Sequence, residues 1–127
     1  MLEFNKDCLF NLKQTDLSNC NKNARAIMTP DEQLLGVFRT IRDQIIFTDK
    51  RIISVDVEGV TGMRQDIFTL PYSKVQYFSI RTKGFLELFA DSELTLFFSN
   101  GCKCTFEFSD RCDITAIGRS ISSCILN

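Results

Sequence analysis

The chain has 127 residues, the length of a single domain, and its 15 basic and 16 acidic side chains leave a formal net charge of −1. This balance argues against a nucleic-acid partner, because nucleic-acid-binding domains present a strongly basic surface. The sequence contains no histidine, the commonest acid–base group of active sites, so we expect a protein that is not an enzyme and needs no cofactor.

Residues 1–28 form an N-terminal segment without a sustained hydrophobic period, and we expect this segment to be partly irregular. The segment contains no basic region followed by an apolar stretch, and no apolar run in the chain is long enough to span a bilayer. These features predict a cytoplasmic protein. One short helix is expected in the segment, lined by Leu2, Cys8, Leu9 and Leu12.

The six cysteines are expected to be reduced thiols that pack as small apolar side chains. Structural zinc sites usually present two spaced pairs of ligands. Here Cys102 and Cys104 are separated by a single residue, and no cysteine pair has the C-x-x-C spacing. We therefore predict no metal site.

Residues 29–32 predict the start of a brief helix and of the main domain, which we place at 29–127. Thr29 can cap the helix, Pro30 suits its first position, and Glu32 can close a capping box. The helix must be brief, because the sequence already has the pattern of a strand from Leu34 onward.

From there the chain alternates short apolar runs with turn signals, which is typical of an antiparallel β-fold. The clearest turn is Asn100-Gly101, because both residues accept the positive φ angles of a tight hairpin. The expected strands are 34–39, 44–48, 51–57, 66–70, 75–81, 94–98 and 102–108, with a further stretch around 85–89.

Two neighbouring strands are apolar on consecutive residues instead of alternating. Ile45-Ile46-Phe47 and Ile52-Ile53 place large side chains on both faces of the sheet, whereas a strand with one wet face alternates. Both faces must therefore be covered. The cover is either a partner or the chain itself, through a bent sheet or through the N-terminal segment folding back.

A single amphipathic helix is predicted near the C-terminus. Apolar residues recur at helical spacing along one stripe from Ile114 to Ile125, and Ser109 or Asp110 can cap the helix. Gly118 lies within this stripe, where it costs about 1 kcal/mol relative to alanine. We interpret it as a point of close approach between the helix and the sheet.

Three short segments carry a family resemblance: Ile-Phe-Thr-Asp-Lys-Arg at 46–51, Gly-Val-Thr-Gly at 59–62 and Leu-Pro-Tyr-Ser at 70–73. In this order, and followed by further strands and one helix, residues 30–126 resemble the bacterial pleckstrin-homology (PH) domain family. The resemblance implies a mainly β fold, a seven-stranded bent antiparallel sheet or partly open barrel capped by a C-terminal α-helix. It also implies a tendency to assemble into ring-like homo-oligomers.

The function that these features favour is a non-catalytic interaction or scaffold domain that binds copies of itself. Apolar side chains on the strands would form the contacts between copies, and we predict Ile46, Ile52 and Phe97 at this interface. An open sheet edge offers a second route, because a protein or peptide partner can extend it by one strand.

The alternative function is that of a peripheral domain that binds phosphoinositides or other anions. Such binding needs several basic side chains converging on phosphate groups. Solvated arginines beside turns are the simpler interpretation, since Asp43 and Asp66 dilute the charge. The candidate residues for binding an anion or a membrane lipid are Arg39, Arg42, Arg64 and Lys103.

Overall fold

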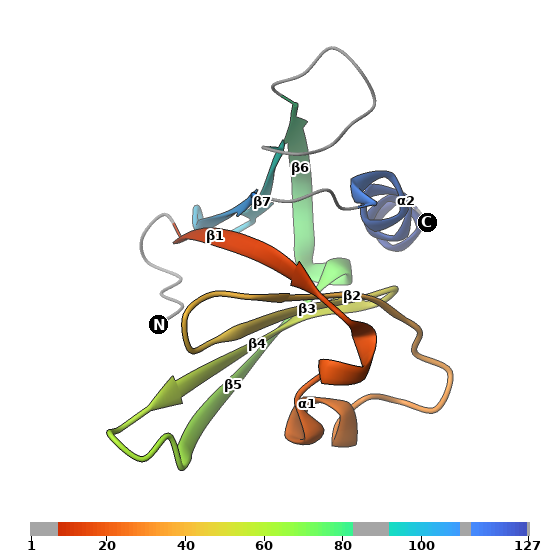
Figure 1. The fold of residues 1–127 in the computed structure, drawn as a ribbon. Helices are drawn as coiled ribbons and strands as arrows, with labels where there is room; N and C mark the ends of the chain where they lie inside the picture. Colours follow the sequence, from red (N-terminus) through yellow and green to blue (C-terminus); the bar gives the residue numbers. More distant parts are fainter. Residues whose placement is uncertain (1–7, 83–91, 110–112, 127) are drawn as a thin grey trace.

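The structure, a computed structural model, describes residues 8–82, 92–109 and 113–126. The stretch expected around 85–89 lies outside these residues. The strands of the described part form one sheet in the order β5-β4-β3-β2-β1-β8-β7-β6 (Figure 1). The elements are β1 (Cys8–Thr15), η1 (Leu17–Asn19), α1 (Lys22–Ala26), β2 (Leu34–Arg39), β3 (Gln44–Thr48), β4 (Arg51–Glu58), β5 (Arg64–Pro71), η2 (Tyr72–Lys74), β6 (Val75–Arg81), β7 (Ser92–Phe98), β8 (Lys103–Phe108) and α2 (Ile114–Ile125).

The strand predictions within the described residues are confirmed. Strands β2, β3 and β6 begin and end at the expected residues, and the others differ by one or two residues at their ends. Strands β4 and β5 are longer than expected because Glu58 pairs with Arg64 across the turn that joins them. Gly59 and Gly62 allow that turn, with φ angles of 83° and 70°.

The short helix expected within the N-terminal segment was wrong, because Cys8–Thr15 forms strand β1. This strand runs parallel to β8 and antiparallel to β2. It thereby joins two antiparallel groups, β2–β5 and β6–β8, into one sheet and raises the strand count from the expected seven to eight in the described residues. Pairing on both sides outweighs a weak local helical pattern.

The brief helix expected at residues 29–32 is a turn. The N–H of Glu32 donates to the carbonyl of Thr29 at 3.0 Å, and the N–H of Thr29 donates to Glu32 Oε1 at 3.1 Å. The Glu32 side chain therefore forms its half of a capping box, whereas the N–H of Glu32 binds the backbone carbonyl of Thr29 and not its hydroxyl, and no helix follows. The chain instead enters β2 at Leu34, where pairing with β3 supplies its backbone hydrogen bonds.

The two apolar faces of β3 and β4 are both covered by the chain itself. On one face, Ile45, Phe47 and Ile52 pack into the main core, which α2 closes. On the other face, Ile46 and Ile53 pack beneath the N-terminal segment in a second core. Figure 1 shows α1 and α2 on opposite sides of these strands. Both forms of cover by the chain itself are therefore observed: the bent sheet with α2 covers one face, and the N-terminal segment covers the other. That segment contributes Cys20, Ala24 and Met28 to the second core.

Helix α2 is capped by Asp113, not by the predicted Ser109 or Asp110. Asp113 Oδ1 accepts a hydrogen bond from the N–H of Ala116 at 3.1 Å, which satisfies one of the free donors of the first turn. The interpretation of Gly118 is confirmed, since a Cβ atom there would stand 3.2 Å from Ile80 Cδ1. A side chain at this position would require Ile80 or the helix to shift by a few tenths of an ångström.

We predict that a charged side chain in place of Ala24, a buried residue of α1, destabilises the second core. Ala24 is fully buried, so Ala24→Asp should lower the free energy of unfolding by about 3 kcal/mol or more, because a carboxylate there has no partner. Ala26→Asp is the matched control in the same helix, at an exposed position, and should cost less than about 1 kcal/mol. Urea denaturation measures both. Equal losses would mean that α1 does not cover the sheet.

Candidate functional site

Two turns at one end of the molecule hold the predicted basic residues. The β2–β3 turn is closed by the N–H of Thr40, which donates to the carbonyl of Asp43 at 3.0 Å. From this turn Arg42 reaches the neighbouring β4–β5 turn, where its Nη2 donates to the carbonyl of Gly59 at 2.5 Å. Figure 1 shows both turns on the same side of the sheet. The guanidinium therefore fixes the two turns relative to each other.

The structure brings three of the four predicted basic residues to this end. Arg39 ends β2 and Arg64 begins β5, and both side chains are exposed. Lys103 begins β8, on the other side of β1 in the sheet, and does not join them. The sequence analysis missed Lys13, which is exposed and lies directly opposite Arg39 in the β1–β2 register. Lys13 could not be found without knowing that residues 8–15 form a strand.

The three residues predicted at an interface lie in different places. Ile46 and Ile52 have no exposed surface and pack within the two cores, so they offer no area to a second copy. Phe97 is half-buried on β7, where its ring stacks on that of Tyr77 at a centroid distance of 4.3 Å and an angle of 8°. Tyr77 is 56% exposed and was not predicted. Its place opposite Phe97 follows from the β6–β7 register, which contains an irregularity between Val75 and Tyr77.

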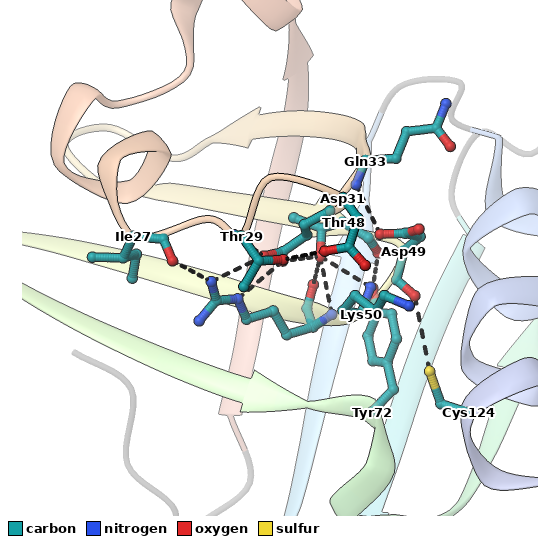
Figure 2. A network of polar contacts seen from close by, with 11 residues as sticks. Ile27, Thr29, Asp31, Gln33, Thr48, Asp49, Lys50, Tyr72 and Cys124 are labelled. Atoms are coloured by element: carbon teal, nitrogen blue, oxygen red, sulfur yellow. Dashed lines mark hydrogen bonds and ion pairs between the residues drawn. The ribbon is translucent and has the colours of Figure 1, made fainter.

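A buried carboxylate lies at the centre of a polar network beside the β3–β4 turn (Figure 2). The side chain of Glu32 is only 1% exposed, and its two oxygens accept hydrogen bonds from Arg51 Nε at 2.9 Å and Arg51 Nη2 at 3.0 Å. Thr48 Oγ1 donates to the same carboxylate at 2.5 Å. Arg51 Nη2 also donates to the carbonyl of Ile27 at 2.7 Å, so the pair joins the N-terminal segment to β4.

The hydrogen bonds decide the ionisation of Glu32. Burial alone would raise its pKa, but the bonds from Arg51 and Thr48, together with the N–H of Thr29, outweigh burial and lower the pKa below the ordinary 4.5. The neighbouring Tyr72 hydroxyl donates to the carbonyl of Thr48 at 2.8 Å. Burial raises the pKa of Tyr72, which keeps this donor protonated.

A groove of about 390 Å³ lies between the β3–β4 turn and α2. The N–H of Gln33 donates to Asp49 Oδ1 at 2.8 Å, and the Cys124 thiol on α2 contacts the carbonyl of Asp49 at 3.8 Å (Figure 2). The lining carries one acidic and two basic side chains, together with amide and hydroxyl groups, so the groove can hold a polar group by hydrogen bonds. Its lining residues are Gln33, Asp49, Lys50, Arg119, Ser120, Ser123 and Cys124.

Residues 8–82, 92–109 and 113–126 contain no group of three cysteine or acidic side chains arranged to hold a metal ion. Within the same ranges, no helix has both the length and the apolar character needed to cross a membrane.

We predict that the ionised form of Glu32 stabilises the fold. A lowered pKa means that this contribution is complete above about pH 4.5 and is lost as the pH falls through the pKa of the folded state. Glu32→Gln should therefore lower the free energy of unfolding by about 2 kcal/mol at pH 7, and the difference should shrink under acid conditions. Chemical denaturation across this pH range measures it. The control, Asp31→Asn, changes an exposed neighbouring carboxylate and should have little effect at either pH.

Comparison with known proteins places the chain in a family. The family model of the bacterial PH domain matches residues 3–125. The chain is 40% identical over 73 residues to the uncharacterized protein YjqA of Bacillus subtilis (strain 168). That match covers 58% of this chain and 57% of YjqA, so it spans little more than half the length of the relative.

Two solved structures are similar over most of the chain. One is a DUF1696 family protein with a pleckstrin-homology domain from Shewanella loihica PV-4, with a TM-score of 0.66 and 30% identity over 90% of this chain and 97% of that protein. The other is a pleckstrin homology domain from Shewanella amazonensis SB2B, with a TM-score of 0.55 and 29% identity over 89% of this chain and 90% of that one. The family match over nearly the whole length, the mainly β sheet and its single C-terminal helix lead to one conclusion: the chain belongs to the bacterial PH domain family.

Proposed function

We propose that the protein is a non-catalytic PH-like domain that binds copies of itself through β6 and β7. The observation that carries this proposal is the exposed stack of Tyr77 on Phe97. Aromatic pairs bury a large area at little cost in side-chain entropy, and they are enriched at interfaces between proteins. The stack lies on the outermost strand of the described sheet and its neighbour.

The position of β6 supports the same proposal. β6 is the last strand in the described sheet order, where it pairs with β7. An edge strand can add a strand from another chain through its backbone groups. Contact between copies would then be formed by Tyr77 and Phe97, since Ile46 and Ile52 have no exposed area.

The chemical groups of the chain support a role without catalysis. Histidine, the commonest acid–base group of active sites, is absent from the sequence. We therefore assign binding, not turnover, as the proposed activity.

Binding of an anionic headgroup is a second candidate, favoured by the pairing of Lys13 with Arg39. Two like charges opposite each other on neighbouring strands are destabilising, and a bound anion removes the repulsion. Arg42 lies in the adjoining turn and is held there by Gly59. The site is therefore formed by one end of the sheet.

The first test is the mass of the purified protein in solution, measured by light scattering under reducing conditions. A discrete multiple of 14.5 kDa is expected for the wild type. Tyr77→Asp and Phe97→Asp should each reduce that mass to one copy, because each places a charge in the apolar contact. Ile41→Asp, at a fully exposed position on a turn, is the matched control and should leave the mass unchanged. A wild-type monomer would contradict the proposal.

The second candidate is tested by co-sedimentation with vesicles that contain phosphoinositide. Changing Arg39 and Arg42 together to alanine should weaken binding by about tenfold or more, since two charge-assisted contacts are removed. Lys103→Ala removes a positive charge on the other side of β1 and should have a much smaller effect. Equal losses in both variants would point to general charge attraction without a defined site.

A further inference from the structure

Three large apolar side chains stand almost completely in solvent at the tips of the two joined turns. Ile41 is 100% exposed, Val60 105% and Met63 86%. We propose that these residues, named here the apolar tips, insert into the surface of an anionic lipid bilayer. The inference rests on the second function proposed above in that it needs a lipid surface. It adds a contact between the apolar tips and the acyl chains, and this contact does not require phosphoinositide.

The apolar tips are held in position by the turns beneath them. Arg42, next to Ile41, donates to the carbonyl of Gly59, next to Val60. Asp43 Oδ1 accepts a hydrogen bond from the N–H of Val57 at 2.9 Å, which joins the β2–β3 turn to the end of β4. The tips therefore form one unit that can enter a membrane without first becoming ordered, and this lowers the entropic cost of binding.

The shape of the apolar tips favours a fluid surface over a folded protein. A protein interface needs contiguous area with close complementarity, whereas these side chains project from two separate turns. Apolar side chains that enter the boundary between headgroups and acyl chains need only to project from the protein and to have polar groups around them. Each turn supplies these polar groups from its flanking residues. Arg39 and Arg42 lie beside Ile41, and Arg64 follows Met63.

The charge around the apolar tips is complementary to anionic lipid. Arg39, with Lys13 opposite it, forms a pair of exposed cations on β1 and β2. Asp43 and Glu58 flank the two turns, and Asp66 lies two residues beyond Arg64, so three acidic residues stand against the four cations Lys13, Arg39, Arg42 and Arg64. Basic side chains at a membrane surface each contribute about 1 kcal/mol of attraction to anionic lipid.

Tryptophan fluorescence tests insertion directly, because the chain contains no tryptophan. Val60→Trp provides a single reporter at the tips, and Leu126→Trp provides the matched control at a residue 79% exposed beyond α2. With vesicles in which about a third of the lipid is phosphatidylglycerol, the reporter at position 60 should shift to the blue and be quenched by brominated acyl chains. The reporter at position 126 should do neither. An unshifted spectrum at position 60 would overturn the proposal.

Co-sedimentation with the same vesicles tests the wild-type side chains. Changing Ile41, Val60 and Met63 together to serine should weaken partitioning by about tenfold or more, and Leu126→Ser should leave it unchanged. Vesicles of phosphatidylcholine alone should bind the wild type more weakly. Failure of the wild type to sediment, or equal binding by the triple variant, would overturn insertion. Retained binding of phosphoinositide vesicles by that variant would leave headgroup recognition standing by itself.

Discussion

The buried carboxylate of Glu32 is the constraint on which the rest of the structure depends. An unpaired charge in this position would cost several kcal/mol, so Arg51 and Thr48 must lie where they can donate to it. Arg51 in turn binds the carbonyl of Ile27, at the end of α1. One ion pair thereby holds the β3–β4 hairpin, the entry into β2 and the N-terminal segment in a single arrangement.

The covering of β3 and β4 on both faces follows from that arrangement. Once residues 17–28 are held across the sheet, Ile46 and Ile53 become core residues, and the largest apolar surface suggested by the sequence disappears into the monomer. The apolar surface that stays exposed is therefore smaller than the sequence suggested. The exposed apolar groups that our proposals use are the Tyr77–Phe97 stack on β6 and β7 and the apolar tips of the two turns.

These two surfaces belong to different halves of the sheet, separated by β1 and β8. Contact between copies through β6 and β7 would therefore leave the apolar tips of each copy free for a membrane. Several weakly inserting domains in one assembly would bind a membrane far more tightly than one domain, because each further insertion takes place at a high effective concentration. The two proposals thus support each other while depending on different residues.

The sequence by itself determined the elements whose signals are local. Alternation along β8, the Asn100-Gly101 turn and the stripe of α2 depend on neighbouring residues, so strand and helix positions could be predicted closely. Only the tertiary structure decided which face each strand buries, because burial depends on distant segments. It made β1 a strand through pairing with β2 and β8, removed Ile46 and Ile52 from the surface, and brought Lys13, Arg39 and Arg42 to one end. These outcomes arise from contacts between residues far apart in the chain, which no local pattern records.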